Sequence, residues 1–239
     1  MSIADKLKVI AENEQRVYES GYENGYGSFW DGFQQNGNRD NYDYGIMGAG
    51  WTDETFRPKH KLKFVGKNTY IFGYSQIVDL KSTMARCGFY ELDFTQSTDT
   101  NYIFRWSIVK YCPKVITGAK TTINGLFPYA EKLEIIEELV LNANNTNHPR
   151  FDCCYELLEM NISGVVQRTL YAKDCSKLIT SDAINTIQHL KNCSGTSDEY
   201  KYSVNFHADV WARLDALGNN SPNGNTWKEY VVDLGWNVG

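Results

Sequence analysis

Apolar residues recur every three or four positions at the start of the chain. Ile3, Leu7, Ile10 and Val17 would lie on one face of a helix, and aromatic residues extend the pattern to about residue 33. Several glycines weaken the second half of this helix, since each costs about 1 kcal/mol relative to alanine. The apolar stripe has two interpretations: residues 1–33 form an oligomerisation stalk, or they pack against their own domain.

The periodicity stops in residues 34–68, where Asn, Asp and Gly predict an irregular joint. The stretch "FWDGFQQNGNRDNYDYG" (29–45) invites comparison with a calcium-binding loop. Placing Gly37 at the sixth loop position, however, puts Gly32 at the first, where a carboxylate is required. Turn formation explains these polar residues better, and we expect no metal site.

A different pattern begins near residue 69 and occurs five times. An aromatic residue or Leu is followed by a small residue, then by an apolar residue three positions later and a strand-like pattern. The copies are "YIFGYSQIVDLK" (70–81), "YIFRWSIVKYCPK" (102–114), "LFPYAEKLEII" (126–136), "RFDCCYELLEMNI" (150–162) and "LYAKDCSKLITS" (170–181). Their small residues are Ser75, Ser107, Ala130, Cys154 and Cys175, at intervals of 32, 23, 24 and 21 residues. The last three intervals match the roughly 20–29-residue period of leucine-rich repeats.

This repetition predicts a solenoid over residues 69–180, because a single repeat cannot bury its apolar face whereas stacked repeats share a core. The long first interval contains "YELDF" (90–94), a further candidate strand. Cys154 and Cys175 are expected to be small buried hydrophobes where the returning chain crowds the core. The phenylalanines expected in the core are Phe72, Phe104, Phe127 and Phe151.

Residues 181–239 follow another pattern and are expected to form an α+β unit that caps the repeats. Ser181 is a candidate N-cap for a helix, and "YSVNFH" (202–207) alternates as a strand does. "ADVWARLDALG" predicts a helix that Gly218 ends, and a T-x-x-E capping box at Thr226 begins the last helix. The predicted fold class is therefore α/β: an irregular leucine-rich-repeat solenoid with an N-terminal helix and a C-terminal cap.

Charge and composition narrow the range of functions. The 239-residue chain has a net charge of −5 and no basic run, which argues against a dedicated nucleic-acid binder. Charged residues interrupt the N-terminal region where a secretory signal would be apolar, and no apolar run approaches the roughly 20 residues that span a bilayer. We therefore expect synthesis in the cytoplasm and no membrane insertion. None of the six cysteines forms a C-x-x-C pair, and no cofactor is expected.

The sequence contains no G-x-S-x-G, P-loop or G-x-G-x-x-G motif. "NHPRFDCC" brings His148, Asp152, Cys153 and Cys154 close together in sequence. A catalytic Cys–His pair, however, requires contact in space and a lowered thiol pKa, and the repeat alignment directs Cys154 into the core. We therefore expect a protein that is not an enzyme.

Candidate binding residues come from the aromatics and from the exposed face of the strands. Tyrosine offers a large amphipathic contact area and can stack on sugar rings. The tyrosines outside the expected core positions are Tyr111, Tyr129 and Tyr155. The strand face supplies Glu137, Glu159 and Asn161, with further negative charge from Glu134, Glu138 and Glu156. A ligand with cationic or hydroxyl groups would suit this face, which could equally be a solvated acidic surface.

Four segments carry a resemblance to a known family. They are "IADKLKVIAENEQRVYESGY", "FWDGFQQNGNRDNY", "GWTDETFRPKHKLKF" with "IVDLKSTMARCGFYELDFT", and the ending "ITSDAINTIQHLKNCSGT…LGWNV". In these the chain resembles BspA-like leucine-rich-repeat proteins, and more narrowly the short members found among phage and prophage genes of gut Firmicutes. The resemblance implies a solenoid with a binding or structural role, and it supplies no catalytic residues.

The expected function is non-enzymatic binding or adhesion, on a phage tail or another displayed surface, with a host-surface protein or glycan as the ligand. We expect a virion-associated homo-oligomer that also contacts other tail proteins. One alternative is a structural virion or prophage component that binds only its own assembly. A third is an intracellular effector or thiol enzyme.

Overall fold

The computed structural model describes residues 52–54, 56, 63–67, 72–73, 75–86, 88, 90–99, 102–118, 125–142 and 148–239. The expected N-terminal helix lies outside these residues, and so do the stretch 29–45 and most of the joint. The proposed oligomerisation positions Ile3, Leu7, Ile10 and Val17 are therefore also outside the described residues.

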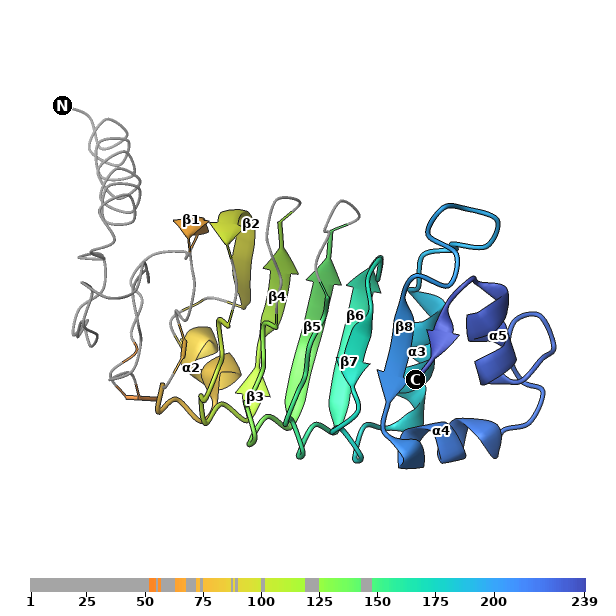
Figure 1. Cartoon of the computed structure of the whole chain (residues 1–239). Helices are drawn as coiled ribbons and strands as arrows, with labels where there is room; N and C mark the ends of the chain where they lie inside the picture. The colour runs from red at the N-terminus through yellow and green to blue at the C-terminus, as the bar shows by residue number, and fades with distance from the viewer. Residues whose placement is uncertain are drawn as a thin grey trace.

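The fold combines α-helices and β-strands around a parallel sheet that curls into a half-barrel, with few helices (Figure 1). The strands pair in the order β1-β2-β4-β5-β3, and β6 also pairs with β5. Their bounds are β1 Lys63–Lys67, β2 Glu91–Asp99, β3 Tyr111–Cys112, β4 Lys114–Thr117, β5 Ile135–Leu141 and β6 Glu159–Gly164. The predicted α/β class is confirmed, and the candidate strand at 90–94 belongs to β2.

One row of inward-facing aliphatic side chains crosses the sheet. The parallel register places Leu92 beside Val115, Val115 beside Leu139, and Leu139 beside Ile162. All four side chains are fully buried. Because each strand contributes one member, the sheet buries a continuous apolar strip that no single strand could cover.

A second row, of stacked phenylalanines, runs alongside the sheet where the chain bends between strands. Successive ring centroids from Phe72 through Phe104 and Phe127 to Phe151 are 5.2, 4.8 and 5.7 Å apart, and the planes are within 14° of parallel. Phe56 meets Phe72 edge-on at 5.6 Å and closes one end of the row. The expectation that these phenylalanines are core residues is confirmed, since all of them are buried.

The small residues of the five sequence copies occupy equivalent places in the structure. The amide of each donates a hydrogen bond to the carbonyl three residues earlier, as in Ser107 to Phe104, Ala130 to Phe127 and Cys154 to Phe151. All five side chains are buried, as expected. The Cys154 thiol donates to the Phe127 carbonyl oxygen at 3.1 Å, and burial raises the pKa of this thiol well above its usual value. The bend thus repeats with a side chain small enough to fit beneath the neighbouring turn.

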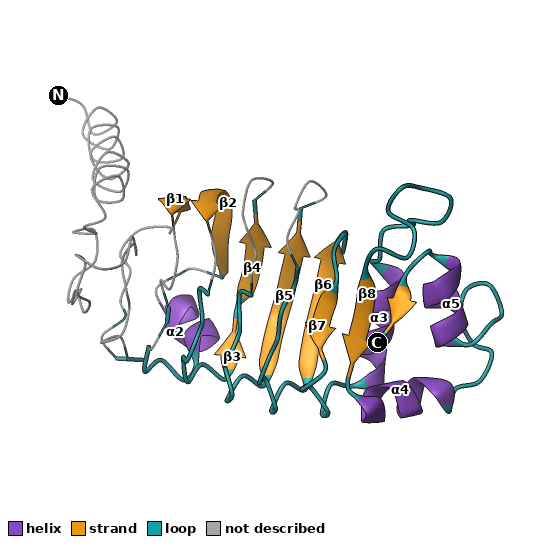
Figure 2. Cartoon of the chain, viewed as in Figure 1, coloured by secondary structure: helices purple, strands orange, loops and turns teal. Residues whose placement is uncertain are grey.

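The C-terminal part adds a parallel three-stranded sheet and most of the helices, which gather at one end of the molecule (Figure 2). The strands are β7 Leu170–Ala172, β8 Ser203–Phe206 and β9 Asn237–Val238. The helices are α3 Thr180–Gln188, α4 Ala208–Asp215 and α5 Trp227–Asp233, while α2 Leu80–Arg86 lies near the opposite end. The strand expected at 202–207 is confirmed by β8.

Helix α3 covers the outer edge of β6. The carboxylate of Asp182 accepts the Met160 amide at 2.7 Å, and the side-chain oxygen of Asn185 accepts the Ile162 amide at 2.9 Å. An exposed strand edge would leave these donors free to pair with another chain. At the other end, the Asp53 carboxylate accepts the amides of Val78 and Asp79 just before α2.

Helix ends show where local signals were sufficient. Thr226 forms the predicted capping box with Glu229 at the start of α5. The prediction that Ser181 is the N-cap is wrong: α3 starts at Thr180, two residues earlier than predicted. Its N-cap Ile179 makes no side-chain capping bond, and the Ser181 hydroxyl donates to Asp182. The reason is tertiary, because the Ile179 amide is bound to the Leu158 carbonyl at 2.9 Å, which fixes where the helix begins.

Candidate ligand-binding cleft

The strand-face residues expected to bind a ligand lie on adjacent strands. Glu137 projects from β5, and Glu159 and Asn161 project from β6, all exposed. Glu137 forms an ion pair with Lys81 of α2 at 3.1 Å. The structure thus places the three residues on neighbouring strands, and it also gives the first of them an intramolecular partner.

The further acids of this face are also paired. Glu134 accepts hydrogen bonds from Lys110 at 2.7 Å and from the Tyr111 hydroxyl at 3.1 Å. Glu138 pairs with Lys114 at 3.0 Å, and Glu156 pairs with Lys177. The hydrogen bond from Lys110 lowers the pKa of Glu134, and hydrogen bonds from Ser163 and then Lys114 lower the pKa of Glu138. The hydrogen bond to Glu134 raises the pKa of Tyr111. The expected local negative charge is therefore largely offset by lysines, and Tyr111 is committed to Glu134.

A cleft of about 330 Å³ opens instead along the bends that join the strands. Its charged lining residues are Arg105, Arg150, Asp152, Lys173 and Asp174. The remaining lining residues are Tyr102, Gly125, Pro128, Tyr129 and Cys153. We refer to the space lined by these ten residues as the bend cleft. They come from four successive bends of the chain.

Aromatic rings surround one arginine of the bend cleft. The Arg105 guanidinium carbon lies 3.7 Å from the ring centre of Trp106, 4.9 Å from that of Tyr102 and 5.2 Å from that of Tyr129. Trp106 and Tyr129 also stack on one another at 5.8 Å. Such cation–π contacts fix the position of the guanidinium.

The second arginine combines an ion pair with an aromatic contact. Arg150 Nε donates to Asp152 Oδ2 at 2.7 Å, which raises the pKa of the guanidinium, and its guanidinium carbon lies 4.5 Å from the ring centre of Tyr171. Asp174 accepts the Cys153 amide at 2.8 Å. Lys173 is exposed and has no ion-pair partner among the described residues.

Unusual backbone conformations gather at these bends. Tyr102, Trp106, Tyr129 and Cys153 have φ between 56° and 61°, the left-handed region that non-glycine residues seldom occupy. Of the described non-glycine residues, only Tyr200 shares this property. Three of the four directly precede the small residue of a bend, whereas Asp174, which precedes Cys175 in the last bend, does not share the conformation. Glycine would satisfy it without strain, whereas this chain presents Trp, Tyr and Cys there.

The tyrosines predicted from sequence separate into different settings. Tyr129 lines the bend cleft and keeps 40% of its surface exposed. Tyr155 is 49% exposed and is not a lining residue. A hydrogen bond with Cys153 raises the pKa of Tyr155 to about 12. Of the six predicted binding residues, only Tyr129 therefore belongs to the cleft.

The Cys–His arrangement considered from the sequence is not formed by the described residues. His148 Nδ1 lies 3.3 Å from the Thr169 carbonyl oxygen, and the ring meets Tyr171 edge-on at 5.7 Å. Burial lowers the pKa of His148 and raises that of the Cys154 thiol, which is opposite to the thiolate that nucleophilic chemistry needs. No group of three His, Cys, Asp or Glu side chains suited to a metal ion occurs in the described part of the chain.

Sequence reasoning missed the arginines and Lys173. The available signal was positional: Arg105 directly follows the stacked Phe104, and Arg150 directly precedes Phe151. Residues beside a repeated core position lie at the same bends of neighbouring turns, so they gather along one edge even when far apart in sequence.

Comparison of the chain with protein-family models, with curated proteins and with solved structures gave no match. Within the described ranges, none of the helices is both long and apolar enough to cross a membrane.

Proposed function

We propose that this protein is a non-enzymatic binding protein that recognises a host-surface protein or glycan through the bend cleft. In this proposal it is an irregular leucine-rich-repeat solenoid of the BspA-like type, spanning residues 69–180, with a capping unit at 181–239. The single observation that carries the function is the cleft itself, in which arginines and aromatic rings from successive bends converge.

Support for the solenoid comes from the repetition of one local structure. Five bends share the same hydrogen bond and a buried small residue, at intervals of 21 to 24 residues after the first. Three of these bends are each followed by a strand that joins the same parallel sheet. Such stacking of equivalent turns is the physical basis of repeat proteins.

Support for binding comes from the chemistry of the lining residues. Tyr and Arg, which both line the cleft, are among the side chains most enriched at energetically important contact sites, because they combine a large apolar area with polar groups. The cleft volume of about 330 Å³ falls at the lower end of the range for small-ligand pockets. The left-handed backbone at Trp106 and Tyr129 presents both rings at exposed positions.

The proposal also includes display on a phage tail or related particle. Residues 1–33 would join several copies, and multivalent attachment would increase avidity even where each site is weak. We expect light scattering to detect a homo-oligomer for the full chain and a monomer after deletion of these residues. A monomeric full-length protein would remove the stalk from the proposal.

Attachment to intact bacterial cells tests the function directly. The substitution Tyr129→Ala removes an exposed ring of the cleft, and we expect it to reduce cell attachment of the oligomer at least about tenfold, a loss of about 1.4 kcal/mol. Tyr90→Ala is the matched control, because Tyr90 is 70% exposed and is not a lining residue of the cleft. Equal attachment of both variants would contradict the proposed site. No attachment by the unmodified oligomer, with co-purification of particle proteins, would favour a structural virion component.

A further inference from the structure

We propose that the bend cleft takes a linear acidic saccharide, a chain of sugar rings that bear carboxylates, laid across successive bends. This inference rests on the proposed function, since it assumes that the cleft is a binding site. It adds the chemical class of the ligand and the residues that recognise its charge.

The balance of charge in the cleft favours an anionic ligand. Three cations, Arg105, Arg150 and Lys173, line it against two carboxylates, whereas the whole chain has a net charge of −5. Asp152 engages Arg150 through Nε, and the terminal nitrogens of that guanidinium are the ones suited to a paired hydrogen bond with a ligand carboxylate. Lys173 adds an ammonium group that pairs with no carboxylate of the described residues.

The aromatic lining favours a sugar ring as the carrier of that charge. Rings of Tyr102 and Tyr129 border the cleft, and the parts that Arg105 and Trp106 leave uncovered provide apolar surface on which the C–H face of a sugar can pack. Arg105 lies against both rings and against Trp106, so the rings are held in place before a ligand arrives. Little side-chain freedom is then lost on binding, which favours affinity.

The shape of the cleft favours a chain over a single sugar. The lining residues come from four successive bends, and the stacked phenylalanine rings at the first three of these bends are 4.8 and 5.7 Å apart. Three steps at the spacing of paired strands give a length of roughly 14 Å. A ligand that repeats along this direction would meet a cation or an aromatic ring at each bend.

The two carboxylates distinguish a saccharide from a nucleic acid. Asp152 and Asp174 each use one oxygen within the protein, and the second oxygen of each can accept a sugar hydroxyl. The same carboxylates would repel a closely spaced run of phosphates. Hydroxyl donors combined with well-separated negative charges therefore match this lining better than a polyphosphate chain does.

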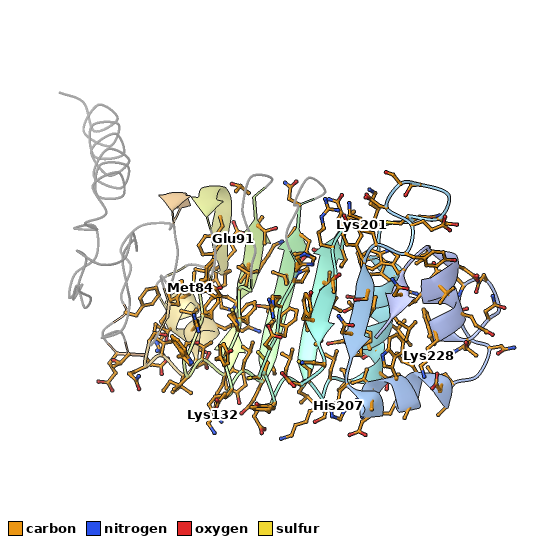
Figure 3. The ribbon with its side chains drawn as sticks, in the orientation of Figure 1. Met84, Glu91, Lys132, Lys201, His207 and Lys228 are labelled. Carbon is orange, nitrogen blue, oxygen red and sulfur yellow. The ribbon has the colours of Figure 1, made fainter. Side chains whose placement is uncertain are left out.

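The test compares two ligands that differ only in charge: trigalacturonate and its neutral, carboxyl-reduced trisaccharide. Calorimetric titration of the full chain is expected to give at least about tenfold tighter binding of the acidic form. The substitution Lys173→Gln should weaken trigalacturonate binding about tenfold, the effect of losing one charge-assisted hydrogen bond, and leave the neutral ligand unchanged. Lys132→Gln is the matched control, because Lys132 is exposed, lies on the lower edge in Figure 3 and does not line the cleft.

Each other outcome overturns the inference. Equal affinity for the two trisaccharides would remove charge recognition, and equal losses in the Lys173 and Lys132 variants would indicate nonspecific attraction. Binding of an oligothymidylate more tightly than trigalacturonate would favour nucleic acid. Failure to bind either trisaccharide, in a protein whose attachment to cells still depends on Tyr129, would refute the ligand class while the proposed function stands.

Discussion

The glutamate-bearing strand face and the bend cleft belong to the same turns of chain, yet they differ in how most of their cations are held. On the sheet face, lysines pair with glutamates about one repeat further along, as in Lys110 with Glu134 and Lys114 with Glu138. In the cleft, Arg105 is stacked among aromatic rings and Lys173 is exposed.

The difference shows how the repeat length decides which side chains become neighbours. A period of 21 to 24 residues brings side chains one repeat apart within a few ångströms, so opposite charges at equivalent positions neutralise one another. In the bend cleft, aromatic residues hold the Arg105 guanidinium instead. Under the proposed function, the paired surface serves stability and the aromatic surface serves recognition.

The largest expected effect would show whether the two surfaces share one core. Phe127 is fully buried and stacks between Phe104 and Phe151, so Phe127→Ala should lower the free energy of unfolding by about 3–5 kcal/mol. Denaturant titration followed by circular dichroism should still give a single transition. Phe127→Leu keeps much of the volume and should cost clearly less. Two separate transitions in the Ala variant would mean that the surfaces are supported independently.

Buried hydroxyls provide the next test, because they too differ between the sheet and the bends. The Thr117 hydroxyl, at the end of β4, donates to the Val140 carbonyl at 2.9 Å and accepts the Asn142 amide at 3.1 Å. Thr117→Val should therefore lower the free energy of unfolding by about 1–3 kcal/mol, measured by thermal or chemical denaturation.

The buried Ser107 hydroxyl has no hydrogen-bond partner in the described structure, and Ala130 occupies the equivalent place in the next bend. Ser107→Ala should leave stability unchanged or raise it by up to about 1 kcal/mol. A loss equal to that of Thr117→Val would contradict this contrast.

A smaller effect is expected from the ion pairs of the sheet face. Glu138 binds Lys114 at 3.0 Å and the Ser163 hydroxyl at 2.7 Å, but it is partly exposed, so Glu138→Gln should cost less than about 1 kcal/mol. The loss should shrink in concentrated salt, measured by denaturant titration. Glu159→Gln is the control, since Glu159 forms no ion pair in the parts of the chain that are described. Weaker ligand binding in the Glu138 variant would show that the paired face also takes part in recognition.

The smallest expected effect is on the pH dependence of stability, and it compares His148 with the paired glutamates Glu134 and Glu138. Burial lowers the pKa of His148 below its unfolded value of about 6.5, so its contribution to stability is complete above that pH and is lost as pH falls through the folded pKa. Hydrogen bonds, from Lys110 to Glu134 and from Ser163 and Lys114 to Glu138, lower the pKa of both carboxyl groups. Their contribution is therefore present above about pH 4.3 and is lost as pH falls through the folded pKa. His148→Gln should therefore flatten the melting-temperature profile between about pH 7 and 5 and leave the acid limb unchanged. An unchanged profile in the upper range would rule out this role for His148.

Much of the framework could be predicted because it depends on local patterns. The recurring Phe and small residues identified the core positions, and the capping box at Thr226 identified the start of α5. The start of α3 could not be predicted in the same way, since the bond from Ile179 to Leu158 joins separate turns. Pairing of the strand-face acids was also hidden, because each lysine partner lies one or more repeats away in sequence.

The sequence by itself determined the repeat, the buried phenylalanines and the small residues of the bends, because burial imposes a periodic choice of side chain on the chain. Only the tertiary structure decided which cations gather in the cleft. Arg105 and Lys173 are ordinary polar positions when read along the chain. They meet in one cleft because stacking places the bends of four turns side by side. The sequence of any single repeat does not show which residues of other repeats will lie next to it.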